Sequence, residues 1–480
     1  MTLKVYNSMT NEKEEFKPLE GKTVKMYVCG QTVYDYMHVG HARTYVSFDI
    51  VRRYLEYLGY SVETVINITD VNKKINDRAR EEGESPWSIA EKFAEINLED
   101  FDDLGIEADA YPRASDYMDE MIDLVEELVD KGLAYEAGGD VFFDVRKFEK
   151  YGELSNQDLE NIRPERTDEI ISSEKKKNPE DFALWKSQEG SELSPTWESP
   201  WGEGVPGWHI ECSTMSLSLL GEQFDIHGGG SDLVFPHHEN EIAQTEGVTG
   251  KKWVNYWMHS GLVQMGEEKM SKSQQNFVSV RELSKEHDPQ ALRLMIAEGH
   301  YRNPMKYSDE RIEKAEKTLK SLENTVRNLR AEINSFEESI PSKMREKDIE
   351  FLEQVFNLKE KFLEAMNDDF NTPIALRNLH ELSKLAQSYL EENPKRPVLS
   401  RALTTILDLG GILGILEAKE ERQFKRGGLM GNLMEEILKL RERYRTKDEY
   451  ELADSIRNAV EKAGITIEDT KRGPRWKSAE

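Results

Sequence analysis

Two histidines near the N-terminus are spaced so that they could bind one ligand together. His38 and His41 enclose Gly40 in the pattern His-Val-Gly-His, where an apolar strand over residues 24–29 should lead into a helix. Free N–H groups and the helix dipole at a helix start favour phosphate. Gly40 would let a phosphate or a base approach the backbone without a Cβ in the way. Alone, the pattern fits capping or surface histidines equally well.

A lysine-containing loop is the second chemical candidate. Lys269 and Lys272 lie in the run Lys-Met-Ser-Lys-Ser, between Gly266 and a stretch rich in glutamine and asparagine. Two cations on a loop could neutralise the charge that develops on a leaving pyrophosphate. An ordinary exposed basic loop is the alternative, but the order of the histidine pattern and this loop along the chain favours nucleotide chemistry.

A third set has ligand types that suit Zn²⁺: two thiols, one imidazole and one carboxyl group, from Cys29, Cys212, His237 and Glu241. If Pro236 is the first residue of a helix, His237 and Glu241 project from the same helical face. Packing of buried cysteines would explain the same residues, and His238 or Glu239 would serve as well as ligands. The residues alone leave these alternatives open.

The elements around these residues predict a parallel sheet. A strand at 24–29, a helix at 44–58 and a strand at 62–68 form a βαβ unit, and ligands of such sheets bind at the carboxyl ends of the strands. A further strand at 224–226 runs into His227 and three glycines. We therefore expect an α/β Rossmann-like catalytic domain over residues 1–115 and 203–252, split by a connective insertion at 116–202. In the insertion we expect a helix at 117–131 and a strand at 141–145, whereas the rest of it has no clear periodicity of apolar residues.

The second half of the chain reads as mainly helical. A linker domain over 253–307 carries the lysine loop, and an α-helical bundle over 308–421 follows. Apolar residues at alternating spacings of three and four predict that one stripe of its first helix faces the core: Ile312, Ala315, Leu319, Leu322, Val326, Leu329 and Ile333. Further helices are expected at 348–366, 373–392 and 399–413, and a small α+β domain at 422–480.

Composition limits the class of protein. The chain has 480 residues, 38% of them hydrophobic, a net charge of −28 and two cysteines. There is no apolar run of membrane-spanning length and no signal-peptide pattern, so we expect a cytoplasmic protein. The acidic balance argues against nucleic-acid binding over the whole surface, although basic residues outnumber acidic ones from 422 to 480.

Taken together, the motifs resemble those of class I cysteinyl-tRNA synthetases. They run in family order from the first strand into the helical bundle: 27–36 leading into His38–His41, 207–213, 227–233, 235–241, 269–273 and 367–372. One departure is Gln31, where the family commonly has proline after Cys-Gly, and we expect this change to be tolerated.

The resemblance implies roles for individual residues. Zinc would bind Cys29, Cys212, His237 and Glu241. ATP, with Mg²⁺, would bind His38, Gly40, His41, Gly228, Gly229, Gly230 and Lys272, with His38, His41, Lys269 and Lys272 as the catalytic groups. L-cysteine would contact Cys29, Thr69, Trp208 and His227. The anticodon of tRNA(Cys) would be read by Arg445, Tyr450 and Asp454, with Tyr450 stacking on a base, although a solvated helix face explains this trio as well.

The reaction implied is ATP-dependent formation of cysteinyl-adenylate and transfer of cysteine to tRNA, by a monomeric enzyme. A ligase that joins cysteine to an amino sugar would share the catalytic half, but it would not need the bundle or the C-terminal domain. A non-catalytic tRNA-binding relative should have lost the histidine pattern or the lysine loop. Both are present here.

Overall fold

The computed structural model describes residues 2–157, 175–188, 190, 194–265, 268–269, 277–336 and 343–416, and, in the last part of the chain, 437–438, 440–441, 443–445, 450–462, 465–470 and 473–478. These residues belong to two compact units, Met1–Leu416 and Glu417–Glu480. The four expected boundaries within the first unit, at residues 115, 202, 252 and 307, remain predictions.

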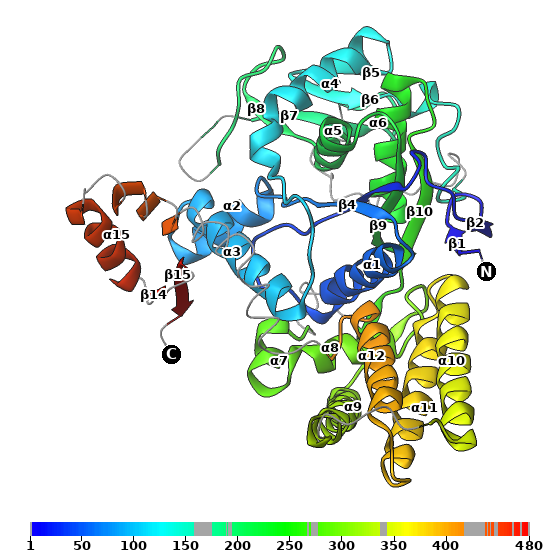
Figure 1. The fold of residues 1–480 in the computed structure, drawn as a ribbon. Coiled ribbons are helices and arrows are strands. Elements are labelled where there is room, and N and C mark those ends of the chain that lie inside the picture. The colour runs from blue at the N-terminus through cyan, green and yellow to red at the C-terminus, as the bar shows by residue number, and fades with distance from the viewer. Residues whose placement is uncertain are drawn as a thin grey trace. The chain divides into compact units, whose positions relative to one another are not determined.

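A parallel four-stranded sheet lies at the centre of the first unit (Figure 1), with the strand order β10-β9-β3-β4. The strands are β3 (Thr23–Val28), β4 (Ser61–Ile66), β9 (Phe224–Gly230) and β10 (Val254–Ser260). β3 pairs with β4 on one side and with β9 on the other, so strands from the two sides of the insertion are neighbours. This confirms the expected split α/β sheet. β10 pairs with β9, so the fourth strand falls in the range assigned to the linker domain.

The crossover helix α1 (Val39–Tyr57) begins five residues earlier than the predicted start at residue 44. His38 is the N-cap, and its ring accepts a hydrogen bond from the backbone N–H of His41. Histidine is not among the residues that usually mark a helix start, which is why the apolar pattern alone placed the start too late. The histidine motif is therefore the first turn of α1 itself.

The insertion contains more regular structure than its sequence indicated. The helix α4 (Met118–Asp130) and the strand β6 (Asp140–Phe143) agree with the predicted helix at 117–131 and strand at 141–145. β6 belongs to a four-stranded antiparallel sheet with β5 (Ala134–Ala137), β7 (Phe182–Ser187) and β8 (Gly204–Pro206), of which β8 follows the predicted end of the insertion at 202. The first four residues of β7, Phe-Ala-Leu-Trp, are all buried. A strand as short and as buried as β7 shows no alternation of polar and apolar residues, so periodicity did not reveal it.

Helices cover the sheets and connect the strands. They are α2 (Lys73–Glu82), α3 (Pro86–Leu104), α5 (Trp208–Leu220), α6 (Glu239–Thr249), α7 (Val280–Glu286) and α8 (Pro289–Ala297). An N-terminal hairpin consists of β1 (Lys4–Asn7) and β2 (Glu12–Glu15). A small sheet holds β11 (Val263–Met265), β12 (Glu268–Lys269) and β13 (Met305–Tyr307), in the order β12-β11-β13.

The helical bundle is present as expected: α9 (Asp309–Ser335), α10 (Glu346–Asn367), α11 (Thr372–Leu390) and α12 (Arg396–Ile412). Six of the seven predicted stripe residues of α9 are buried, and Ile333 is half-buried. In the second unit, α15 (Tyr450–Lys462) is followed by the hairpin β14 (Ile465–Thr470) and β15 (Gly473–Ser478), around a small core of Leu438, Val460 and Ile467.

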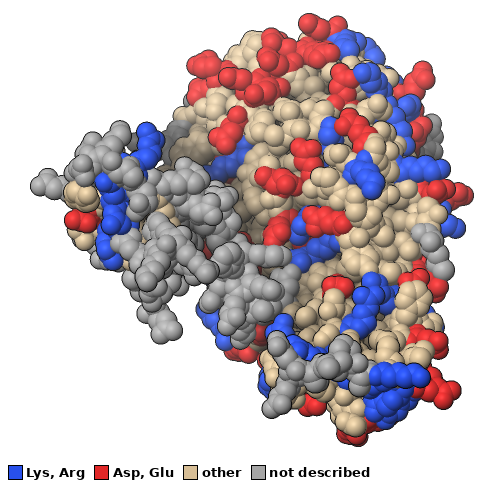
Figure 2. Space-filling model, in the orientation of Figure 1, with Lys and Arg blue, Asp and Glu red and all other residues tan. Residues whose placement is uncertain are grey.

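The surface carries many charges of both signs. Figure 2 shows acidic side chains gathered at the top of the view, over the region of α4, all of whose acidic residues are exposed. Among the helices that the structure describes, none is both long enough and apolar enough to cross a membrane.

A buried ionic cluster joins α1 to the elements around it. The carboxylate of Asp49 lies 2.7 Å from Arg52 Nη2, 2.7 Å from Arg53 Nε and 2.5 Å from Arg293 Nη2. Arg293, on α8, also donates to the carbonyl of Leu104, at the end of α3. Burial disfavours the ionised carboxylate, but the three guanidinium groups outweigh burial and hold the pKa of Asp49 below its ordinary value.

We expect Asp49→Asn to lower stability by about 3–5 kcal/mol, because it leaves buried guanidinium groups without their counter-charge. The depressed pKa means that the contribution of Asp49 is present above the unfolded carboxyl pKa of about 4 and is lost as the pH falls through the folded-state value. Denaturant unfolding at several pH values measures both effects. The matched control is Asp408→Asn, at an exposed carboxylate on α12. Equal stability of the two variants near neutral pH would contradict this expectation.

Candidate active site and metal centre

The potential metal ligands meet at the carboxyl edge of the central sheet. Cys29 directly follows β3, and its N–H donates to the carbonyl of Gly228 on β9 (2.9 Å). Cys212 lies on α5, and Glu241 lies in the first turn of α6. His237 precedes α6 rather than lying on it. Phe235 has an extended backbone and is the only residue of Val234–His238 with non-helical backbone angles. Helical backbone therefore runs from Pro236 into α6, as predicted, and His237 and Glu241 lie on the same face.

The side chains of the four expected ligands lie close together in the structure. Cys29 Sγ lies 3.7 Å from Cys212 Sγ and 3.7 Å from Glu241 Oε1, and His237 Nε2 lies 3.0 Å from Glu241 Oε1. One potential ligand atom of each residue lies within 4.8 Å of the others, and all four residues are buried. The two 3.7 Å separations match the edges of a tetrahedron around an ion with bonds of about 2.0–2.3 Å, and the 3.0 Å separation is shorter than such an edge. The donor set therefore fits a thiophilic ion such as Zn²⁺.

A second donor set overlaps the first. It consists of Cys29, His227, His238 and Glu241. His238 Nε2 lies 3.3 Å from Cys29 Sγ, and His227 Nε2 lies 2.8 Å from Glu241 Oε2. Cys29 and Glu241 are common to both sets. Geometry alone thus permits a metal ion to be held with either Cys212 and His237 or His227 and His238.

Two further histidines, which the sequence did not single out as site residues, extend this polar cluster. His209 Nδ1 is hydrogen-bonded to His237 Nδ1 (2.8 Å), and His238 Nδ1 is hydrogen-bonded to His259 Nε2 (2.8 Å). His259 in turn contacts the hydroxyl of Ser8 (2.8 Å). The only sequence signal for His209 was its place between Trp208 and Cys212, and His259 had none. Hydrogen bonds of this kind orient metal-binding imidazoles.

Burial favours the neutral forms of the groups in the cluster when no cation is bound. Burial raises the pKa of the Cys29 thiol, and it raises the pKa of Glu241 to about 7 against the opposing effect of His237. Burial also lowers the pKa of His227 and of His237 to about 3. A bound cation would reverse the balance for the thiols and the carboxyl group, because it binds their deprotonated forms.

The histidine motif forms a compact structure at the start of α1. His38 Nδ1 accepts from the N–H of His41 (3.1 Å), and the two rings stack with centroids 3.6 Å apart. A Cβ on Gly40 would lie 2.8 Å from the His38 ring. The glycine is therefore needed for the ring to lie over the first turn, whether or not a ligand also approaches there.

Both ends of the lysine loop lie in described backbone, and the end after the loop contacts the histidine motif. Before the loop, Lys269 lies in β12, opposite Gln264 of β11. After it, the N–H of Val39 donates to the carbonyl of Val278 (3.0 Å), and the N–H of Val280 donates to the carbonyl of Met37 (2.8 Å). The predicted catalytic residue Lys272 lies outside the described residues. The backbone contacts bring one end of its loop next to the His38–His41 motif.

Close neighbours explain why glycine is required at the three positions at the end of β9. A Cβ on Gly228 would lie 2.3 Å from the Phe48 ring of α1, and a Cβ on Gly229 would lie 2.8 Å from His238. A Cβ on Gly230 would lie 2.5 Å from a carboxylate oxygen of its neighbour Asp232. Close approach of α1 and of the histidine cluster therefore requires glycines here, and an ATP-binding role for them stays a prediction.

The predicted cysteine-binding residues surround the potential metal ligands. Thr69 is buried, and its hydroxyl donates to Glu211 Oε2 (2.9 Å). The Trp208 ring lies 4.3 Å from the ring of His237, and His227 is hydrogen-bonded to Glu241. Glu211, beside Cys212, was not singled out from the sequence, because a lone glutamate on a helix carries no distinctive signal.

The three predicted anticodon contacts lie in the second unit. Tyr450 and Asp454 are one turn apart on α15, and both are exposed. Arg445 has a helical backbone, as do residues 443 and 444. Ala453 and Val460, on a neighbouring face of α15, are buried. The exposed pair is compatible with a ligand-binding face.

Comparison with known families and proteins identifies the chain. Residues 15–317 match the model of the class I (C) tRNA synthetase catalytic domain, and residues 361–417 match the DALR domain. A cysteine–tRNA ligase of Thermococcus gammatolerans is 48% identical over 481 residues, covering 99% of both chains. The chain belongs to the cysteine–tRNA ligase family. Another relative in this family, from Clostridioides difficile, is 44% identical over 476 residues, covering 99% of this chain and 100% of the relative.

Solved structures of other class I synthetases share the fold of this chain. A methionyl-tRNA synthetase of Mycobacterium tuberculosis in complex with methionyl-adenylate superposes with a TM-score of 0.61 at 18% identity, covering 82% of this chain and 90% of that one. A leucyl synthetase in a ternary complex from Agrobacterium radiobacter superposes with a TM-score of 0.60 at 12% identity, covering 84% and 86%. At these identities the likeness concerns the fold alone.

The two donor sets of this ligase family member predict different effects of substitution. If Cys212 is a direct ligand and His238 only supports the site, Cys212→Ser should weaken metal binding more than His238→Asn. For His238→Asn we expect the roughly 10–100-fold loss typical of an outer hydrogen-bonding partner. Competition with a chelator, read by metal content per chain, measures both. A larger loss from His238→Asn would favour the second donor set.

Proposed function

We propose the following route for the cysteine–tRNA ligase reaction in this chain. The protein activates L-cysteine with ATP and Mg²⁺ to cysteinyl-adenylate, releasing pyrophosphate, and then transfers cysteine to the terminal adenosine of tRNA(Cys). The observation that carries the proposal is the buried thiol, imidazole and carboxyl cluster, located where the carboxyl ends of β3 and β9 meet. Full-length similarity to cysteine–tRNA ligases supports the same reaction.

Adenylation depends on positioning and on charge. The carboxylate of cysteine attacks the α-phosphorus of ATP, and negative charge accumulates on the departing pyrophosphate. We assign His38 and His41, with the N–H groups at the start of α1, to the phosphates, and Lys269 and Lys272 to the charge that develops on the leaving group. The backbone contacts between Val39 and Val278 support this assignment, because they hold one end of the lysine loop beside the histidines.

Zinc is the metal that we assign to Cys29, Cys212, His237 and Glu241. This set contains two thiolates, which suit a borderline-soft ion better than the second set with one thiolate. His227 and His238 then become outer partners: His227 orients Glu241 through its second carboxylate oxygen, and His238 contacts Cys29. When bound, the ion would offer the substrate a site that prefers a thiolate to an alcohol.

Selection of cysteine over serine follows from this preference. The two amino acids differ by sulfur for oxygen, so pocket size distinguishes them poorly, whereas a site built around one group of the substrate can discriminate by about 10⁴-fold. Thr69 and Trp208 would form the walls of the pocket. Their positions support this role, because Thr69 is tied to Glu211, the neighbour of Cys212, and Trp208 packs on His237.

Recognition of tRNA extends the proposal to the rest of the chain. We assign the anticodon to Arg445, Tyr450 and Asp454 in a C-terminal domain over 422–480, and we retain the division of the first unit at 115, 202, 252 and 307. The enzyme is proposed to act as a monomer in the cytoplasm. The exposed ring of Tyr450, with 55% of its surface accessible, supports stacking on an unpaired base.

Pyrophosphate exchange followed by tRNA charging tests the main proposal. The purified protein should exchange pyrophosphate into ATP when cysteine is present, without tRNA, and should charge tRNA(Cys) when tRNA is added. Serine at the same concentration is the matched control and should support neither reaction. Exchange without charging would favour a cysteine ligase with another acceptor. Absence of both reactions in protein loaded with zinc would favour a non-catalytic relative.

Tyr450→Ala should reduce tRNA charging while pyrophosphate exchange stays unchanged, because the substitution removes a base-stacking ring far along the chain from the adenylation residues. Loss of one base–aromatic stack corresponds to about 1–3 kcal/mol, or a roughly 5- to 150-fold lower kcat/KM for tRNA. Phe356→Ala, at a 60% exposed ring of the bundle, is the control and should change neither activity. Unchanged charging in Tyr450→Ala would remove Tyr450 from the interface.

A further inference from the structure

The turn between α10 and α11 joins the bundle to the rest of the first unit through one buried carboxylate. Asp369 and Phe370 have φ values of 61° and 52°, in the left-handed region that residues with a Cβ seldom occupy. Asp369 is fully buried. A strained backbone of this kind persists where the surrounding contacts hold it in place.

The carboxylate of Asp369 binds two other segments. Its Oδ1 accepts from the backbone N–H of Tyr6 in β1 (2.9 Å) and from the hydroxyl of Tyr301 (2.9 Å), and its Oδ2 accepts from Arg302 Nε (2.7 Å). The Arg302 guanidinium also lies 4.1 Å from the centre of the Tyr6 ring. One side chain thus holds the N-terminal strand and the loop 300–303 together.

The loop 300–303 contacts the helix that carries the histidine motif. Arg43 of α1, two residues beyond His41, donates through Nη2 to the carbonyls of His300 (3.1 Å) and Tyr301 (3.3 Å) and to that of Asn303. The loop therefore lies between Asp369 on one side and the first turns of α1 on the other.

The same loop leads to the strands at the base of the lysine loop. It continues into β13, which pairs in parallel with β11, and β11 pairs with β12, where Lys269 lies. The N–H of Gly261, between β10 and β11, donates to the carbonyl of Tyr301 (2.7 Å). A shift of the loop would consequently move β11 and β12 as well as the contact with Arg43.

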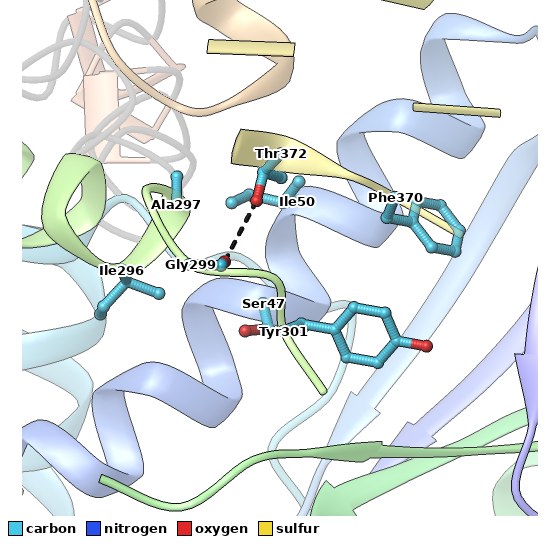
Figure 3. Close-up of a pocket in the computed structure, with 8 residues that line it drawn as sticks. All are labelled: Ser47, Ile50, Ile296, Ala297, Gly299, Tyr301, Phe370 and Thr372. Carbon is cyan, nitrogen blue, oxygen red and sulfur yellow. Dashed lines mark hydrogen bonds between the residues drawn. The ribbon is translucent and has the colours of Figure 1, made fainter. Parts of the chain in front are cut away.

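A small cavity adjoins the loop, so polar contacts supplement the packing of Tyr301 in the apolar core. Figure 3 shows Phe370 and Thr372 from the turn, Gly299 and Tyr301 from the loop region, and Ser47 and Ile50 from α1 around this cavity. The Thr372 hydroxyl donates to the carbonyl of Gly299 (3.4 Å) across it. Where close packing is incomplete, directional polar contacts determine the position of a segment.

From these contacts we propose that Asp369 is a positioning residue for adenylation, which rests on the proposed function. The charge of Asp369 holds Arg302 and Tyr301 in place. The loop 300–303, to which they belong, contacts Arg43 of α1 and leads into β13. The loop thereby sets the position of the histidine motif relative to β12, which contains Lys269. Asp369 touches neither of those motifs in any described contact. Its effect should therefore be on the rate of the chemical step and not on the binding of cysteine or ATP.

Asp369→Asn tests the proposal, because asparagine keeps the size, one acceptor oxygen and the tolerance for positive φ, but it loses the charge that binds Arg302. In cysteine-dependent pyrophosphate exchange, we expect kcat to fall by roughly 10- to 100-fold, the loss that a misplacement of about 1 Å can cause. The KM values for cysteine and ATP should stay within about threefold. Asp368→Asn, at the exposed neighbour that pairs with Lys13, should match the wild type.

A second variant separates positioning from stability. Arg302→Met should reproduce the loss of kcat, and the double variant should lose no more than either single variant, since both break one contact. The proposal is overturned if Asp369→Asn lowers only the thermal midpoint and the folded variant keeps the wild-type kcat. It is also overturned if the KM for cysteine or ATP rises while kcat is unchanged, or if the kcat losses of the two single variants multiply in the double variant. A wild-type protein that does not exchange pyrophosphate would instead overturn the proposed function itself.

Discussion

The structure depends on the burial of a dense polar cluster at one edge of a small parallel sheet. Two thiols, a carboxyl group and several imidazoles form a network of pairwise contacts, and all of them are buried. Such groups are costly to bury in their charged forms, so burial raises the pKa of Cys29 and Glu241 and lowers that of the histidines. The cluster is stable either as a neutral hydrogen-bonded network or around a cation that compensates the negative ligands.

The position of β3 in the sheet makes this cluster possible. β3 lies between β4, from the same half of the catalytic domain, and β9, from the other half, so Cys29 meets side chains almost 200 residues away. The same arrangement places α1 against β9, where Gly228 leaves room for Phe48. The start of α1 and the potential metal site therefore lie at one edge of the sheet, as adenylation of a thiol-containing substrate requires.

The structure also attaches segments that are distant in the sequence rigidly to one another. α1 is held by the Asp49 cluster to α8 and to the end of α3, and by Arg43 to the loop 300–303. The bundle packs in one continuous apolar core with the sheet and α1. Catalysis by positioning needs this rigidity, because the reacting groups come from parts of the chain that share no local structure.

The sequence by itself determined the parallel sheet, the bundle and the histidine motif, because apolar periodicity and motif spacing are local properties of the chain. Ligand chemistry alone left the choice among the potential zinc ligands open, and only the resemblance to a known family implied one set. Only the tertiary structure decided the start of α1 at Val39, the strands β5 and β7 of the insertion and the extended backbone of Phe235. It alone brought His209 and His259 to the cluster and Asp369 to Tyr6 and Arg302. These contacts join residues far apart in the chain, and the type of a single residue does not indicate which distant residue will contact it after folding.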